Sequence, residues 1–500
     1  MDASSSPQPP SRARRGGLQE FVRRLTSGPE TLIVGPDRPA WSAGLVGLLA
    51  LGLALRLPWL GAIPNPWGPE GTAALRALGL ARSANPGGVG ATVLTALTAG
   101  AFRVLGPSFT SARLVMVVAL LAMVAASASL LRRRPALALT VVLLLHPWSV
   151  AWSRTGLDPA AVSLGLAALG PVAWWHAVRA RSTWGVAAAA QLIALGLHFS
   201  PLALLPALAC VAWIALPARR PIFTWPSTWV ALAAGAFHAA IAVKFGPSFV
   251  GAPRPGLGAT VRAIFDTVSG VSTLRYFAGA PSWVEALTAV AVLLLVAVSA
   301  RRVLNDDLGR FAALQLLVAA VGLPLLGRHP VESWGFVLLA PWAIWCAAWA
   351  KTRPERAFIG GGSLAIAVTA ALASHFLQGS GAELALRADA PDGRFWALQV
   401  PRERVAIASL VRAAVLADAR GAPAVITWSE AAFEPLRFVI ASAHGAQIVG
   451  ASLDETIPEG RREYRLTNGR WVLMGWHRVH YWTMPGGLPL AAVWARNTGE

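Results

Sequence analysis

The chain has 500 residues, of which 55% are hydrophobic and only 13% are charged, and its mean hydropathy is +0.54. These values disfavour a soluble fold of this length. A formal net charge of +19 would suggest nucleic-acid binding in a soluble protein. Here, however, the arginines lie in short loops beside apolar stretches, where they fix membrane topology and meet anionic headgroups. We therefore expect membrane lipids as partners and no nucleic acid.

Residues 1–40 are rich in Ser, Pro and Arg, and we expect no cleavable signal peptide. This segment is predicted to be disordered and cytoplasmic. The predominance of arginine over lysine, with abundant Ala, Leu and Gly, is typical of a bacterial source.

The region 41–377 is predicted to be an all-α polytopic membrane domain. About eleven apolar stretches have the length of roughly 20 residues that a bilayer crossing needs. They lie at 41–58, 113–131, 135–152, 160–178, 184–199, 201–217, 228–245, 283–300, 310–327, 333–350 and 357–377.

The basic loops determine how these crossings are oriented. Clusters such as 132–134 and 351–356 are expected in the cytoplasm. If Val89 to Leu105 also crossed, every later basic cluster would face outward, so this segment is predicted to be an interfacial or re-entrant helix. The regions predicted to face outward are then 60–112, 153–159, 246–282 and 328–332.

After Gln378 the composition changes to that of a soluble domain, so 378–500 is predicted to be a small periplasmic α/β domain. It offers a surface for an envelope protein partner. Helices are expected at 403–419 and 435–443, and strands at 424–428, 447–451, 471–476 and 490–495.

Two acids stand out in the predicted outer loops. Glu70 begins an amphipathic stretch, where a carboxylate stabilises a helix start by ~0.3 to 1 kcal/mol even without a catalytic role. Asp158 precedes Pro159 and follows Arg154 by four residues. It is either a helix N-cap or a reactive acid.

Short motifs follow one another along these loops and carry a resemblance to a known family. They are Arg56 followed by Pro69-Glu70, then Asn85-Pro86, GPSFTSAR with Gly106 and Arg113, Leu157-Asp158-Pro159, and RHPVESWGFVLLAP with Arg328, His329 and Pro341. In order and spacing they resemble the polyprenyl-phosphate-sugar-dependent glycosyltransferases of the GT-C fold. Protein O-mannosyltransferases and bacterial lipid A aminoarabinose transferases belong to that group.

The resemblance implies a divergent glycosyltransferase in the bacterial inner membrane, with a polyprenyl phosphosugar as donor substrate and no metal or other cofactor. Asp158 and Glu70 become candidate catalytic residues. Candidate ligands for the lipid phosphate or sugar are Arg56, Asn85, Arg113, Arg154, Arg328 and His329. Taken singly, each arginine could equally be an interfacial anchor.

Two positions depart from the family pattern. Pro69 stands where the family has an Asp taken to be the base, and Asn85 stands where it has a Lys or His. Proline cannot accept a proton, so a non-catalytic subunit of an envelope assembly stays open as an alternative. A transporter is a further alternative, although the repeated halves and broken midplane helices typical of carriers are not evident in the sequence.

Overall fold

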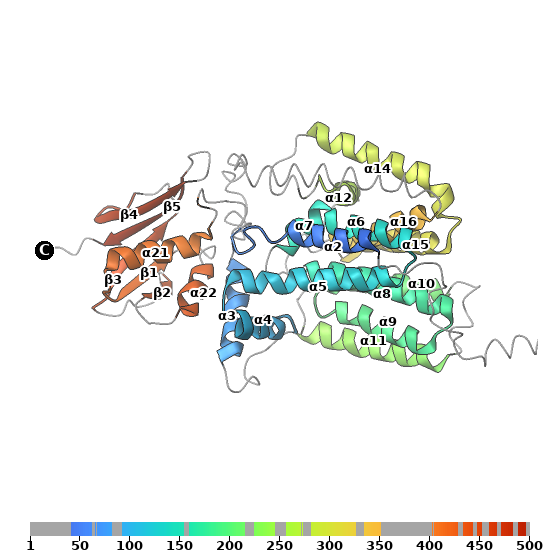
Figure 1. Ribbon diagram of the computed structural model, residues 1–500, viewed down its shortest axis with the longest axis horizontal. Coiled ribbons are helices and arrows are strands. Elements are labelled where there is room, and N and C mark those ends of the chain that lie inside the picture. The colour runs from blue at the N-terminus through green and yellow to red at the C-terminus, as the bar shows by residue number, and fades with distance from the viewer. Residues whose placement is uncertain are drawn as a thin grey trace, which may run out of the picture.

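The computed structural model describes residues 42–62, 66, 68–82, 93–154, 160–215, 225–245, 257–271, 273, 282–326, 335–351, 403, 405–428, 434–443, 448–452, 460–467, 472–483 and 489–496. These residues form a bundle of helices and, at one end of it, a small domain with a β-sheet (Figure 1). We call the end of the bundle beside this C-terminal domain the domain end.

A helix lies at every predicted crossing that falls on described residues. The crossing predicted at 357–377 lies outside them. The bundle helices are α2 (Ala43–Ala54), α5 (Phe109–Ser129), α6 (Arg133–Leu145), α7 (Pro147–Ser153), α8 (Ala160–Ala180), α9 (Thr183–Gly196), η2 (Pro201–Ala203), α10 (Leu204–Ala215), α11 (Pro226–Phe245), α14 (Ser282–Val303), α15 (Asp307–Leu326) and α16 (Gly335–Ala350).

Within the described part of the chain, three helices are long and apolar enough to cross a membrane on their own: 109–129, 160–180 and 307–325. The pair α6 and α7 makes a fourth span if the two are counted together, with a bend of 57° between them. The chain therefore has the features of a multi-pass membrane protein. The total of about eleven crossings stays a prediction.

Helix α16 lies in the interior of the bundle. All its residues from Gly335 to Ala350 are buried, against α6, α8 and α15 among others. A helix that is apolar on every side has to be surrounded by other helices or lipid, and the sequence GFVLLAPWAIWCAAWA has no polar face. The close contact of Gly335 with Trp148 leaves no room there for a larger side chain.

Three further helices lie in the regions predicted to face outward. Helices α3 (Gly68–Arg82) and α4 (Val93–Leu105) pack against each other, and α3 lies between the bundle and the C-terminal domain (Figure 1). Helix α12 (Leu257–Ser269) packs against α14 and α16. No helix was predicted from the sequence at this third position.

The C-terminal domain has a five-stranded sheet in the order β2-β1-β3-β5-β4. Strand β1 is parallel to β2 and β3, while β5 is antiparallel to β3 and β4. Helices α21 and α22 contribute to its buried core. The elements are α21 (Ile407–Ala419), β1 (Ala424–Trp428), α22 (Glu434–Ser442), β2 (Ile448–Ser452), β3 (Arg462–Thr467), β4 (Trp476–Thr483) and β5 (Pro489–Arg496).

The helices and the strands predicted at 424–428, 447–451 and 490–495 are confirmed within a few residues, but the strand predicted at 471–476 is wrong. The strand there starts at Trp476, because the chain turns immediately before it at Gly475, whose φ is +79°. Strand β3 was missed because its sequence REYRLT is polar on one face and buries only Tyr464 and Leu466 on the other.

Candidate active site

Three arginines from different elements converge on the last turn of α2 and the backbone that follows it. The last carbonyl groups of a helix have no partners within the helix and can accept from side chains. Arg56 donates to the carbonyl of Gly52, Arg154 to those of Leu55 and Pro58, and Arg113 to that of Leu60. We call Arg56, Arg113 and Arg154 the arginine cluster.

Arg56 is completely buried, and residues of α6 and α7 accept hydrogen bonds from its guanidinium group. Its Nε donates to Ser153 Oγ at 2.7 Å, and its two terminal nitrogens donate to Ser149 Oγ and to the carbonyl of Leu144, both at 3.0 Å. These oxygens carry no net charge. They satisfy the guanidinium group as a hydrogen-bond donor without cancelling its positive charge.

The break between α6 and α7 brings these serines to Arg56. His146 precedes Pro147, and a residue before proline is disfavoured in helical conformation, so α6 ends there. Pro147 then begins α7, and the His146 side chain accepts from the amide of Trp148 as a cap. Ser149 and Ser153, four residues apart on α7, share the helix face that meets Arg56.

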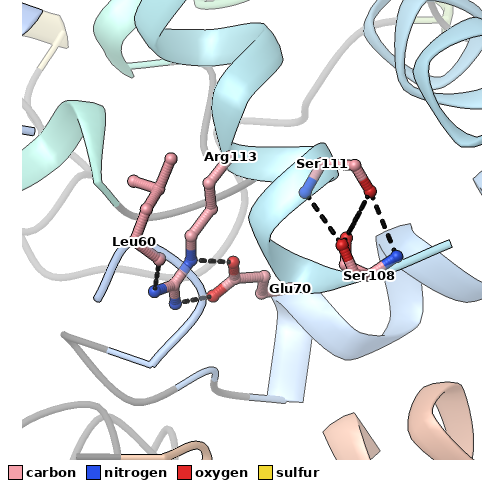
Figure 2. A network of polar contacts seen from close by, with 5 residues as sticks. All are labelled: Leu60, Glu70, Ser108, Ser111 and Arg113. Carbon is pink, nitrogen blue, oxygen red and sulfur yellow. Dashed lines mark hydrogen bonds and ion pairs between the residues drawn. The ribbon is translucent and has the colours of Figure 1, made fainter. Parts of the chain in front are cut away.

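Arg113 and Glu70 form a buried ion pair (Figure 2). Arg113 Nε donates to Glu70 Oε1 at 2.7 Å and a terminal nitrogen donates to Oε2 at 2.8 Å, so the pair is bidentate. Both side chains have no exposed area. Such a pair fixes the orientation of the guanidinium group, because two parallel hydrogen bonds allow one geometry.

The start of α5 holds Arg113 in place. Ser108 caps the helix by accepting from the amide of Ser111 at 3.0 Å, and Ser111 accepts in return from the amide of Ser108 at 3.1 Å (Figure 2). Gly106, with a φ of +81°, turns the chain from α4 into this cap. The sequence GPSFTSAR thus specifies where α5 begins and which way Arg113 points.

Arg154 lies at the end of α7 and is only partly buried, unlike the other two arginines of the cluster. It donates to Leu55 O at 3.1 Å and to Pro58 O at 2.5 Å. Burial and, secondly, repulsion by Arg113 lower the pKa of Arg154 to about 10, which leaves it charged at neutral pH. Arg154 is thus the member of the cluster that a ligand can reach.

The backbone of this segment adopts an unusual conformation at Trp59. Its φ of +50° lies in the left-handed region, which costs a residue other than glycine of order 1 to 3 kcal/mol. This residue stands between the carbonyls of Pro58 and Leu60, which bind Arg154 and Arg113 respectively. The bonds to the two arginines offset this cost.

Of the residues predicted for the site, the structure brings together Arg56, Glu70, Arg113 and Arg154. Asp158, Asn85, Arg328 and His329 lie outside the described residues. Sequence reasoning missed Ser149 and Ser153, which contact Arg56 directly. Their spacing of four residues directly after a His-Pro break in an apolar run was the available signal.

The arginine cluster has the chemistry of an anion site. Arg56 and Arg154 meet neutral oxygens in the contacts given above, and Glu70 is engaged by Arg113. Guanidinium groups bind phosphate oxygens well because their forked N–H groups match the geometry of the anion. A positive site in low-dielectric surroundings favours an anionic headgroup over a neutral one.

The chain matches no known family model and no curated protein. It does match solved structures. The structure of ArnT from Cupriavidus metallidurans bound to undecaprenyl phosphate aligns with a TM-score of 0.56 and 12% identity, covering 92% of this chain and 99% of that one. The apo structure of ArnT from the same organism aligns with a TM-score of 0.54 and 14% identity, covering 90% and 97%.

The chain has the fold of ArnT. ArnT is a lipid A aminoarabinose transferase of the GT-C class, so the family resemblance predicted from the loop motifs is confirmed at the level of fold. The low identity makes the chain a divergent example of this fold. The alignment covers nearly the whole of both chains, so it includes the bundle and the C-terminal domain alike.

Proposed function

We propose that this chain is a membrane glycosyltransferase that moves a sugar from a polyprenyl-phosphate donor to a lipid, glycan or protein acceptor at the periplasmic face. The observation that carries the proposal is the arginine cluster at the domain end of an ArnT-like fold. ArnT itself has been solved with undecaprenyl phosphate bound. The phosphate of such a lipid is the kind of anion that the cluster suits.

In the proposed reaction, an oxygen or nitrogen of the acceptor forms a bond to the anomeric carbon of the sugar while the bond from that carbon to the phosphate oxygen breaks. The acceptor proton passes to a carboxylate, and the polyprenyl phosphate leaves with the bonding electrons. Arg154 stabilises the charge that develops on the leaving phosphate. We assign the proton acceptor to Asp158, four residues after Arg154 in the chain.

The geometry supports a different part for Glu70. Both its carboxylate oxygens accept hydrogen bonds from Arg113 at 2.7 and 2.8 Å, which keeps Arg113 oriented. We therefore propose that Glu70 positions Arg113. A share of Glu70 in proton transfer, which the loss of an acid at Pro69 suggested, stays a prediction.

The remaining assignments extend the same proposal. Arg328, His329 and Asn85 are assigned to the donor, either at its phosphate or at its sugar. The membrane is the bacterial inner membrane, with the domain end and residues 378–500 on the periplasmic side, where an envelope protein could bind. No metal or other cofactor is part of the proposed reaction.

Binding of undecaprenyl phosphate to the purified protein in nanodiscs tests the anion site. Arg154→Ala should weaken binding by about 10-fold or more, because a hydrogen bond to a charged group contributes about 1.5 to 3 kcal/mol. Arg179→Ala is a matched control, since Arg179 lies over the Trp175 ring at the opposite end of the bundle. Undecaprenol, which lacks the phosphate, should bind both variants and the wild type equally weakly.

Transfer is then measured with undecaprenyl-phosphate sugars and a membrane extract as the source of acceptors. The proposal requires phosphate-dependent binding and transfer by the wild type, and both should fall in Arg154→Ala. Equal binding of undecaprenol and undecaprenyl phosphate would contradict it.

A second candidate function is a non-catalytic subunit that binds the lipid phosphate without transferring the sugar. The observation that favours it is Pro69, which stands at the start of α3 where the resembling family has an acid. Tight phosphate-dependent binding combined with no transfer from any donor would select this second function.

A further inference from the structure

Helix α22 of the C-terminal domain packs against α3, and one of its aromatic side chains is buried at this junction. Phe438 of α22 is 1% exposed, and its ring lies 5.5 Å from that of Phe102 on α4 and 4.8 Å from that of Phe109 on α5. Ala112 of α5 and three residues of α3, Ala74, Ala77 and Leu78, belong to the same buried cluster. A side chain from the small domain thus lies in a core that it shares with three helices at the domain end.

The helix faces that hold Phe438 also carry the buried ion pair. On α3, Glu70 precedes Ala74, Ala77 and Leu78 by four, seven and eight residues, which places all of them on one face. On α5, Phe109 and Arg113 are four residues apart and likewise share a face. Phe438 is therefore wedged between the same two helix faces that the Glu70–Arg113 pair joins.

Polar contacts reinforce this junction. A terminal nitrogen of Arg82, at the end of α3, lies 3.4 Å from the carbonyl of Ser442, at the end of α22. Arg103 of α4 donates to the carbonyls of Leu80 and Ala81 on α3, both at 3.1 Å. Helix α3 is thus held on one side by α4 and on the other by α22.

The packing between α3 and α5 depends on aromatic side chains. The alanine-rich face of α3 offers small side chains, so the volume between α3 and α5 is filled by the large rings of Phe102, Phe109 and Phe438. Removal of the Phe438 ring would leave a cavity there, and the helices around a cavity collapse toward it or lose order. Either change moves the Glu70 carboxylate relative to Arg113.

We propose that Phe438 is a positioning residue: the C-terminal domain uses it to hold α3 against α5, and so holds Glu70 and Arg113 in register with the rest of the arginine cluster. The effect on turnover rests on the proposed transferase function. The effect on α3 does not, because it concerns packing alone. The small domain thereby becomes part of the working site, although the described site residues all lie in the bundle.

The full-length protein in nanodiscs allows both effects to be measured. Phe438→Ala removes the ring, and Phe438→Leu keeps an apolar side chain that fills most of the space. Leu416→Ala is the matched control, because Leu416 packs on the core of the C-terminal domain from α21, away from α3. Hydrogen exchange of the amides in 68–82 reports on α3, and turnover at saturating undecaprenyl-phosphate sugar reports on the site.

We expect Phe438→Ala to raise exchange in α3 at least 10-fold and to lower kcat at least 10-fold, with the KM for the donor changed much less. Phe438→Leu should keep amide exchange in α3 and kcat much closer to the wild-type values. Leu416→Ala should leave both quantities within about 2-fold of the wild type. A loss of kcat in Leu416→Ala as large as that in Phe438→Ala would mean that general destabilisation of the domain is the cause, and would overturn the inference.

The two proposals fail in different ways. Unchanged exchange in α3 on Phe438→Ala overturns the positioning role whether or not the wild type is active. Raised exchange with unchanged kcat overturns it as well. A wild type without phosphate-dependent binding counts against the transferase proposal, and the exchange measurement then decides the positioning of α3 by itself.

Discussion

Charged side chains have different kinds of partner at the two ends of the helical bundle. At the end opposite the C-terminal domain, Lys351 Nζ lies 2.9 and 2.8 Å from the two carboxylate oxygens of Asp306, and Trp175 Nε1 donates to Asp307 at 3.2 Å. Lys351 and Arg179 both lie over the Trp175 ring. At the domain end, Arg56 and Arg154 instead meet carbonyl and hydroxyl oxygens in the contacts described above.

This difference separates a structural charge cluster from a candidate binding site. The Lys351–Asp306 pair is about one quarter exposed, and Asp306 also caps α15 through the amides of Leu308 and Gly309. Its charges are matched, so it needs no ligand. At the domain end, the described contacts of Arg56 and Arg154 are to neutral acceptors, and an anionic ligand suits positive charge in such surroundings.

The first prediction concerns which side of the membrane each end of the bundle faces. Ser83→Cys should react completely with a membrane-impermeant maleimide in intact spheroplasts, and so should Asp158→Cys, whereas Arg133→Cys should react only after permeabilisation. The native thiols of Cys210 and Cys346 are buried and give a low background. Labelling of Arg133→Cys in intact cells, with protection of Ser83→Cys, would place the arginine cluster in the cytoplasm.

The second prediction concerns chemistry at the domain end. Asp158→Asn should lower transfer by about 10²-fold or more, since it removes a proton acceptor, whereas an N-cap role would be preserved because Asn caps helices as well as Asp. Membrane insertion and undecaprenyl phosphate binding should be retained. Turnover equal to that of the wild type would show that the carboxylate is structural.

The third prediction concerns how much the buried Glu70–Arg113 pair contributes to the free energy of unfolding. Glu70→Gln leaves Arg113 buried without its anionic partner, and a broken buried pair costs about 3 to 5 kcal/mol. Unfolding can be followed with a thiol-reactive dye, because Cys210 and Cys346 become accessible only when the bundle opens. The double variant Glu70→Gln with Arg113→Met should recover part of the loss, and a loss equal to the sum of the two single changes would show that the residues are not coupled.

The smallest effect is expected at the opposite end. Lys351→Ala removes a partly exposed ion pair and should cost about 1 kcal/mol or less. Transfer and undecaprenyl phosphate binding should not change. If this variant lost activity as strongly as Arg154→Ala, the distinction between a structural end and a binding end would be wrong.

The sequence predicted the bundle helices well because each is a long apolar stretch bounded by arginines or prolines, and these signals are local. Arg56, Glu70, Arg113 and Arg154 became candidate site residues through the resemblance of the loop motifs to the GT-C family. The sequence could not show that both oxygens of Glu70 are engaged by Arg113, since the pair joins residues 43 positions apart. That contact depends on how α3 crosses α5, which composition does not encode.

Other features were missed for the same physical reason. The serines that bind Arg56 lie in an apolar stretch and look like ordinary small residues until the bend at His146 brings them to it. Helix α12 lies in a region that was predicted to face outward with no helix in it, and the helix buries Asp266 and Thr267. The role of Phe438 depends on contacts between elements more than 300 residues apart.

The burial of Arg56 has a consequence for the order in which this protein can be assembled. Its partners Leu144, Ser149 and Ser153 follow it by 88, 93 and 97 residues, so none of them has been synthesised when α2 enters the bilayer. Before those residues arrive, only the carbonyl of Gly52 on α2 is available to Arg56 among the partners described above, and an arginine in that state extends toward the headgroups. We therefore expect α2 to lie nearer the membrane surface during biogenesis, until the insertion of α6 and α7 brings Arg56 to its buried position.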